Sequence, residues 1–255
     1  MKISLKLSAI AALILTLVVF AVPTAGADGG FYIDGKIGWS HQRHSRTLQI
    51  VDPIVSDDDE YSLTASDIAM GRQTNSSFVG GFGIGYNFMP SYNVPVRIDL
   101  EFLARTYKSV NSRYNATVTE TKLDDNSIQT QTLRVTERSQ IGVHTILANV
   151  YYDFVNDSKF TPYVGASFGL AIMHIKLNQL DLENYDLPIY TNLGWVNFAW
   201  GIGAGVNYEI DQDWSLDFRY RYLDASSNAV RRSLPVKLKL GMAIHDVTVG
   251  IRYTF

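Results

Sequence analysis

The chain has 255 residues and a formal net charge of -3, with 46% hydrophobic residues and a mean hydropathy of -0.01. This even composition excludes a bundle of transmembrane helices, and the slight acidic excess gives no reason to expect a nucleic-acid partner. The sequence contains no cysteine, which excludes a disulfide framework and a lipid-modified cysteine. A transmembrane β-barrel stays compatible, because its apolar residues occupy every second position and leave the average close to that of a soluble protein.

The amino-terminal segment predicts export. Lys2 and Lys6 precede a mostly apolar run over residues 7–22, and Ala25-Gly26-Ala27 supplies small residues at the usual cleavage positions. We therefore predict a cleaved Sec signal peptide at residues 1–27, followed by one mature domain at residues 28–255. A retained membrane anchor is the alternative, but the apolar run is shorter than the ~20 residues that a spanning helix needs.

The first predicted strand runs from Phe31 to Ser40, with apolar residues on one face and Asp34 and Lys36 on the other. Residues 41–77 are polar and lose this period, so we expect a long exposed loop. The second strand runs from Phe78 to Phe88. Its polar face carries small residues at every second position: Gly81, Gly83, Gly85 and Asn87.

The third predicted strand, from Val96 to about Tyr107, carries four charged residues on one face. They are Arg97, Asp99, Glu101 and Arg105. In a soluble core, each of these charges would have to be paired or would cost several kcal/mol. Inside a hydrated or salt-bridged barrel lumen, the same residues are expected, so this strand favours a membrane barrel.

The remaining strands are predicted at residues 141–154, 160–174, 197–209, 214–222 and 245–255, although the phase of residues 141–144 is unclear. Polar segments at residues 108–138, 176–194 and 224–241 are expected to be loops, whereas residues 155–159 and 211–213 form short turns. The seventh strand again places charges on its inner face: Asp217, Arg219 and Arg221.

The terminal strand alternates strictly from His245 to Phe255. Val247, Val249 and Ile251 share one face with Tyr253 and Phe255, whereas Asp246 and Arg252 lie on the other.

Eight strands with four long and three short connections predict an all-β fold, an eight-stranded antiparallel transmembrane β-barrel with long extracellular loops and short periplasmic turns. Aromatic residues next to the turns and next to the loops would form two interfacial girdles. So narrow a barrel is filled by side chains. We therefore expect a paired charge network in the lumen, and we expect the glycines of the second and sixth strands to make room for the side chains of Arg97, Arg105, Arg219 and Arg221. Its predicted members are Asp34, Lys36, Arg97, Asp99, Glu101, Arg105, Asp217, Arg219, Arg221 and Arg252.

Several motifs resemble the OmpA-like and opacity-type outer-membrane β-barrel family of Gram-negative bacteria. They are Asn-Val-Tyr-Tyr-Asp-Phe at residues 149–154, Thr-Pro-Tyr-Val-Gly-Ala at 161–166, Arg-Tyr-Arg-Tyr at 219–222 and the Tyr-Thr-Phe ending. The resemblance implies an outer-membrane location, contact with outer-membrane lipid and lipopolysaccharide, and an assembly signal at Tyr253 and Phe255 that the barrel-assembly machinery recognises. Members of this family serve as adhesins, surface antigens, envelope stabilisers or small pores.

No catalytic, cofactor or metal site is predicted. The Gly-x-Gly runs precede no helix pattern, so a phosphate cradle is not expected. His41 and His44 near the acidic run at 57–60 lack fixed metal-ligand spacing. A lipid A deacylase would need a histidine near Ser226, and His245-Asp246 resembles the paired residues of outer-membrane proteases only in part, because those need ten strands and further aspartates.

The sequence therefore predicts a non-catalytic surface protein that acts through its extracellular loops as an adhesin, surface antigen or envelope-stabilising component, with a host surface ligand as a candidate partner. A narrow small-solute pore is the alternative, and a lipid-modifying enzyme is the third hypothesis.

Overall fold

The computed structural model describes residues 30–50, 54–55, 61–65, 68–122, 127–182, 185–187, 191–231 and 236–255. Among these residues, no helix is long and apolar enough to cross a membrane. The predicted signal peptide at residues 1–27 lies outside the described residues. The elements are β1 (Phe31–Ile50), β2 (Ile54–Val55), β3 (Tyr61–Ala65), β4 (Ile68–Asn87), α2 (Met89–Tyr92), β5 (Val96–Arg105), β6 (Lys108–Lys122), β7 (Ile128–Asp153), β8 (Phe160–Leu182), β9 (Tyr185–Leu187), β10 (Thr191–Glu209), β11 (Trp214–Asp224), β12 (Ser227–Arg231) and β13 (Val236–Thr254).

The sheet closes into a ring of eight antiparallel strands, which confirms the predicted fold class. β1 pairs with both β4 and β13, so the first and last strands are neighbours. β5 and β6 are two parts of one strand, because both pair with β7, and β11 and β12 both pair with β13. The remaining pairs, β4–β5, β7–β8, β8–β10 and β10–β11, complete the ring.

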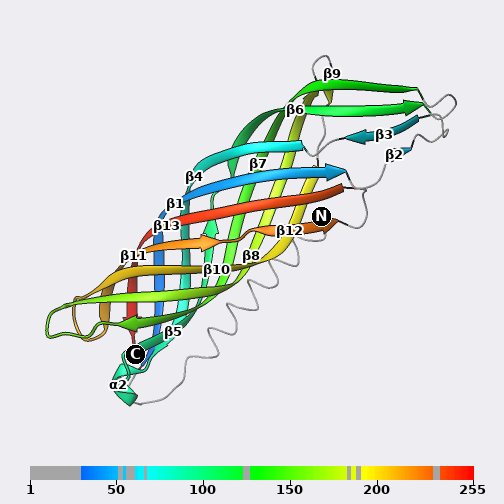
Figure 1. The fold of residues 1–255 in the computed structure, drawn as a ribbon. Coiled ribbons are helices and arrows are strands. Elements are labelled where there is room, and N and C mark those ends of the chain that lie inside the picture. The colour runs from blue at the N-terminus through cyan, green and yellow to red at the C-terminus, as the bar shows by residue number, and fades with distance from the viewer. Residues whose placement is uncertain are drawn as a thin grey trace.

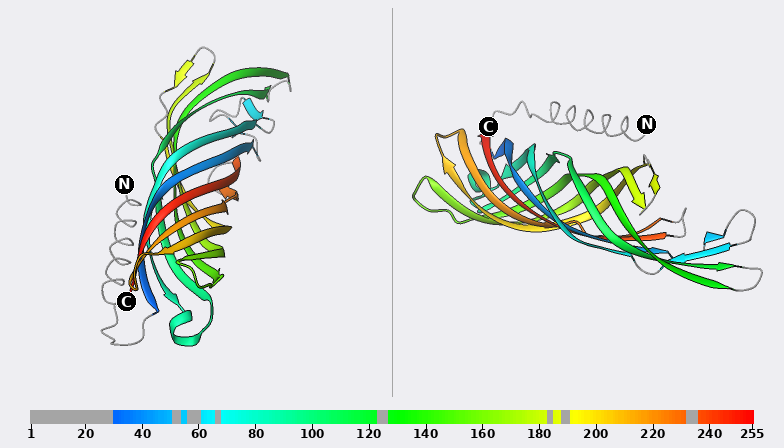
Figure 2. Two further views of the ribbon diagram at one scale, coloured as in Figure 1. Left: turned by 90° about the vertical axis from the view of Figure 1, so that its left-hand side faces the viewer. Right: turned by 90° about the horizontal axis from the view of Figure 1, so that it is seen from above.

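The two ends of the barrel differ. In Figure 1, β2, β3, β6 and β9 gather at one end, here called the loop end, and α2 and the carboxyl terminus lie at the other, the turn end. Both views in Figure 2 show the strands curving together, with the β6–β7 hairpin projecting at the loop end. At the turn end, Asp211 accepts hydrogen bonds from the backbone N–H groups of Asp213 and Trp214 at 3.0 and 2.8 Å, which forms the predicted tight turn.

The predicted alternation separates the two faces of the barrel wall. Large apolar side chains such as Ile37, Leu100 and Val249 are exposed on the outside, whereas Lys36, Glu101 and Thr248 are buried inside. Aromatic rings form a contacting band at the turn end. Its ring contacts include Phe31–Tyr86 at 4.8 Å, Phe160–Tyr208 at 4.8 Å, Trp214–Tyr253 at 4.9 Å and Tyr253–Phe255 at 5.1 Å between centroids.

Large parts of the four segments predicted as loops are strands, so that prediction is wrong for residues 41–50, 54–55, 61–65, 68–77, 108–122, 128–138, 176–182, 185–187, 191–194, 227–231 and 236–241. The β6–β7 hairpin shows the physical reason. Thr117 faces Thr132, and Thr119 faces Thr130, with 3.3 Å between the hydroxyl oxygens of each pair. Because β-branched threonine suits a pleated strand, a polar threonine-rich sequence that lacks apolar alternation still pairs. The acidic run at residues 57–60 lies outside the described residues.

The inner-face glycines make room mainly for residues other than arginine, which corrects part of the prediction. A Cβ on Gly85 would lie 2.4 Å from the ring of Tyr32, and one on Gly205 would lie 2.5 Å from the ring of Tyr163. A Cβ on Gly83 would lie 2.9 Å from a carboxylate oxygen of Asp34. The glycines of β4 and β10 therefore accommodate bulky aromatic and acidic side chains that project from the adjacent strands.

Candidate functional site

The centre of the lumen is organised around Glu101, which is 1% exposed. The ammonium of Lys36 lies 2.7 Å from Oε2 of Glu101, and the guanidinium of Arg219 donates to the same oxygen. Arg221 donates to Oε1 at 2.7 Å. One carboxylate from β5 therefore pairs with one cation from β1, two strands away in the ring, and with two from β11, on the opposite side of the ring.

A second carboxylate extends this network toward the loop end. Oδ2 of Asp246 accepts hydrogen bonds from Arg105 at 2.6 Å and from Arg221 at 3.1 Å. Arg105 also donates to the hydroxyl of Ser40 at 3.0 Å. Because Arg221 contacts both Glu101 and Asp246, the two carboxylates belong to one connected cluster.

Separate pairs fill the lumen toward the turn end. Arg97 forms a bidentate pair with Asp153 at 2.6 and 2.8 Å, and its guanidinium stacks 4.8 Å from the ring centre of Tyr163. Asp217 accepts from Tyr163 at 2.8 Å and from Arg252 at 3.2 Å.

The two remaining carboxylates of the predicted network also have partners. Asp34 lies 2.9 Å from Lys36, and Asp99 accepts from Asn149. All ten residues of the predicted lumen network are buried. Buried charges in these arrangements are compensated by opposite charge and by several hydrogen bonds, which reduces their desolvation penalty.

A layer of apolar side chains closes the lumen nearer the loop end, and the sequence prediction missed it. Leu103, Leu147 and Leu223 are each 0% exposed. The packed cluster contains Val110, Ile141, Val143, Leu147, Ala171, Met173, Ile175, Ala199, Leu223, Ala225, Met242 and Ile244.

On β7, β8 and β13, the apolar residues change from the outer to the inner face at this level. On β7, Ile146 and Val150 point outward, but Ile141 and Val143 point inward, next to the half-buried His144. A wall that is apolar outside meets lipid, and one that is polar outside with an apolar interior meets water. The inward–outward alternation is unclear at residues 141–144 because the apolar residues of β7 change face there.

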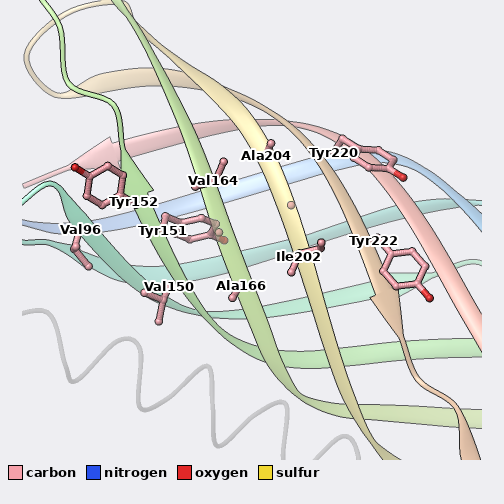
Figure 3. A pocket seen from close by; sticks show the side chains of 12 residues that line it. Val96, Val150, Tyr151, Tyr152, Val164, Ala166, Ile202, Ala204, Tyr220 and Tyr222 are labelled. Carbon is pink, nitrogen blue, oxygen red and sulfur yellow. The ribbon is translucent and has the colours of Figure 1, made fainter.

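The outer wall below that level presents an apolar surface. Figure 3 shows it across β7, β8, β10 and β11, with small and medium side chains between Tyr152 and the tyrosines of β11. The small and medium side chains are Val150, Val164, Ala166, Ile202 and Ala204. A surface of this composition is suited to contact lipid chains.

The structure does not bring together the residues that Sequence analysis considered for a catalytic or a metal site. His245 faces outward and Asp246 faces inward on β13, so they do not act together as a dyad. His41 and His44 likewise lie on opposite faces of β1. Ser226 accepts a hydrogen bond from the backbone N–H of Met242 at 3.1 Å. Among the described residues, no group of three His, Asp or Glu side chains is arranged to hold a metal ion.

An eight-stranded ring with an apolar exterior and a charged, filled interior defines a transmembrane β-barrel of the outer-membrane type. The chain matches the outer membrane protein beta-barrel domain family over residues 10–255, and it belongs to that family. It is therefore an outer-membrane protein of a Gram-negative bacterium.

Individual proteins resemble this chain over most of its length. The outer membrane protein PagN of Salmonella typhimurium is 28% identical over 256 residues, which cover 95% of this chain and 97% of the relative. A Rickettsia conorii protein named as a candidate adhesin is 23% identical and covers 71% of this chain and 69% of its own length. The solved structure of Neisserial surface protein A covers 89% of this chain and 97% of its own, at 19% identity and a TM-score of 0.46.

Proposed function

We propose that this protein is a non-catalytic surface protein that binds a host surface ligand or another envelope component through the paired strands and loops of its loop end. In this proposal the loop end faces the outside of the cell. The function would be that of an adhesin, a surface antigen or an envelope-stabilising component. The candidate adhesin among the relatives supports the first of these.

The length of the strands carries the proposal. β7 has 26 residues, and β1 and β4 have 20 each, whereas about 9–11 residues suffice for a tilted strand to cross a membrane. The excess of β1 and β4 is roughly ten residues, which corresponds to about 30 Å of strand at ~3.3 Å per residue, and the excess of β7 is larger. A barrel that served only as a membrane anchor would not need this platform.

The filled lumen supports a closed barrel rather than the alternative pore. Salt bridges around Glu101 occupy the middle, and the apolar layer around Leu147 and Leu223 lies above it. A pocket of about 260 Å³ at the turn end is lined by Arg97, Asp153 and other polar residues. We expect single refolded barrels in planar bilayers to conduct no ions. Reproducible unit conductance steps would favour the pore.

The absence of enzymatic activity is also part of the proposal. Its support is the opposite orientation of His245 and Asp246, together with the backbone hydrogen bond that occupies Ser226. A deacylase or protease reaction would need a base and its partner within hydrogen-bond distance of each other. Purified barrel incubated with lipid A and with peptide substrates should leave both intact.

The register of the sheet defines a trimmed barrel that tests the surface function. Arg43 pairs with Thr74, and Asn111 pairs with Arg138. Each of these pairs can be closed by a two-residue Asn-Gly turn, which replaces residues 44–73 or 112–137.

We expect the doubly trimmed barrel to assemble, shown by heat-modifiable gel mobility, and to lose binding to host cells. Barrels trimmed at one hairpin each serve as matched controls and locate the binding surface. If the host-cell assay gives no binding for the full-length protein, detergent resistance of the bacteria tests the envelope-stabilising role. A trimmed barrel that assembles and retains full activity in both assays would show that the projecting hairpins do not carry the function.

A further inference from the structure

Four of the five histidines face the outside of the barrel, each at the point where the apolar outer wall of its own strand ends. On β1, β7, β8 and β13, the first polar outward position beyond the apolar wall is a histidine. The histidines, here called the histidine band, are His41, His144, His174 and His245, and the apolar residues that precede them on the same face are Trp39, Ile146, Ile172 and Val247. On β7, β8 and β13, these histidines lie where the apolar residues change from the outer to the inner face.

Two members of the histidine band form a pair on β1 and β13. The rings of His41 and His245 lie 6.5 Å apart. Nδ1 of His41 is 3.0 Å from the hydroxyl of Ser76, and Nδ1 of His245 is 2.8 Å from the hydroxyl of Tyr220. A hydroxyl oxygen can accept a hydrogen bond from a charged imidazolium, so both partners tolerate protonation. In these hydrogen bonds Nε2 is not used and stays available for an external ligand.

The other two members form a second pair on β7 and β8. The rings of His144 and His174 lie 6.2 Å apart, and Tyr107 lies 5.9 Å from His144. Lys176 places its ammonium 5.2 Å from the centre of the Tyr107 ring. Nδ1 of His144 is buried and has no hydrogen-bond partner among the described residues.

Glycines on adjacent strands leave space for this second pair. A Cβ on Gly142 would lie 2.3 Å from the ring of Tyr107, and one on Gly194 would lie 3.3 Å from Nδ1 of His174. The rings of Tyr107 and His174 therefore pack against backbone that carries no Cβ.

We propose that the histidine band binds the phosphate groups of lipid A, the phosphorylated lipid of the outer leaflet. The inference rests on the proposed outward orientation of the loop end. At that level, lipid chains give way to the phosphates, and histidines next to fixed cations present complementary charge. The charged and titratable groups around the first pair are Arg43, Tyr220, Tyr222 and Asp224, and those around the second are Tyr107, Lys176 and the inward-facing Arg105.

The chemistry predicts binding that strengthens in acid. Histidine changes charge between about pH 5 and 8, so it is cationic at the lower end of that range. The neighbouring carboxylate of Asp224 accepts a hydrogen bond from Tyr222, and each histidine pair has a basic side chain beside it, Arg43 or Lys176. Protonation therefore adds positive charge to sites that already carry a cation, and affinity for a phosphate should rise as the pH falls. Burial lowers the pKa of His144 and of His174, so the second pair contributes this charge only in the more acidic part of the range.

The test uses the full-length refolded barrel in nanodiscs, titrated with bisphosphorylated lipid A, with lipid A of the same acylation that has been dephosphorylated, and with phosphatidylglycerol. The variants are the two double substitutions His41→Gln/His245→Gln and His144→Gln/His174→Gln. Lys159→Gln, which removes an exposed cation at the turn end, is the matched control. The thermal unfolding midpoint at pH 5.5 and at pH 8 reports binding, and unliganded midpoints show that each variant folds.

We expect bisphosphorylated lipid A to bind about tenfold more tightly at pH 5.5, equal to ~1.4 kcal/mol, and each double variant to lose part of this gain. Lys159→Gln should retain it. The proposal is overturned if dephosphorylated lipid A or phosphatidylglycerol stabilises equally, or if both folded double variants keep the full pH dependence. Either result would leave the hairpin-trimming experiment unaffected.

Discussion

Replacing Glu101 with glutamine is expected to destabilise the barrel by about 3–5 kcal/mol, the range for removing one partner of a buried ion pair. Glu101→Gln keeps the shape of the side chain but removes the charge that three buried cations share. Lys36 would keep Asp34 at 2.9 Å, and Arg221 would keep a second carboxylate at 3.1 Å. Arg219 would be left with the neutral hydroxyl of Tyr151 at 2.7 Å and carries most of the expected penalty.

The measurement is equilibrium unfolding in urea of the barrel refolded into lipid vesicles, followed by tryptophan fluorescence. Glu209→Gln removes the same charge from an exposed position and should change stability by less than about 0.5 kcal/mol. Adding Arg219→Gln to Glu101→Gln should recover part of the loss, because the uncompensated cation is then removed as well. A loss no larger than that of Glu209→Gln would mean that water solvates these charges, and the reasoning for a closed lumen would fail.

Three further substitutions test the packing, the lipid face and the chain end. Gly85→Ala should destabilise the barrel by about 1–3 kcal/mol in the same assay, because its Cβ would meet the Tyr32 ring at 2.4 Å. Gly35→Ala is the control and should be nearly neutral, because its Cβ would have nothing within 4 Å. Equal effects of the two substitutions would contradict this packing argument. Ile98→Arg, on the lipid-facing surface, should cost about 2–4 kcal/mol if it lies near the bilayer midplane, and a neutral result would place this face in water. Phe255→Ala should lower barrel assembly in cells but should not affect refolding of the purified protein in detergent. If assembly in cells stays at the wild-type level, the proposed assembly signal at the chain end is refuted.

The part of the fold that crosses the membrane could be predicted from the sequence. In that part the outside of the wall meets lipid and the inside faces a polar lumen. Each strand must therefore alternate apolar and polar residues without interruption, as Ile37 and Lys36 do on β1. The charges of β5 identified the inner face directly. Strand order followed from the antiparallel connections, since each strand pairs with its neighbour along the chain.

The pairing of the charges could not be predicted. Which cations surround Glu101 depends on the stagger of the strands around the ring, and Arg219 is 118 residues away in the chain. The projecting hairpins were missed because their threonine-rich strands have polar residues on the outside, without an apolar face that marks the period. The histidines were visible in the sequence, but which of them lie next to each other depends on the same stagger.

The apolar layer explains why the charged network beneath it can persist without water. Where the strands leave the lipid, the outside of the wall becomes polar, and the inward positions are free to pack as a water-excluding core, as Leu147, Met173 and Ile244 do. This core separates the charges around Glu101 from the water at the loop end and leaves them in a low-dielectric interior, where ion pairs are strong and unpaired charges are costly. The exchange of faces on β7, β8 and β13 therefore marks the level of the membrane boundary, closes the lumen and supports the hairpins that project above it.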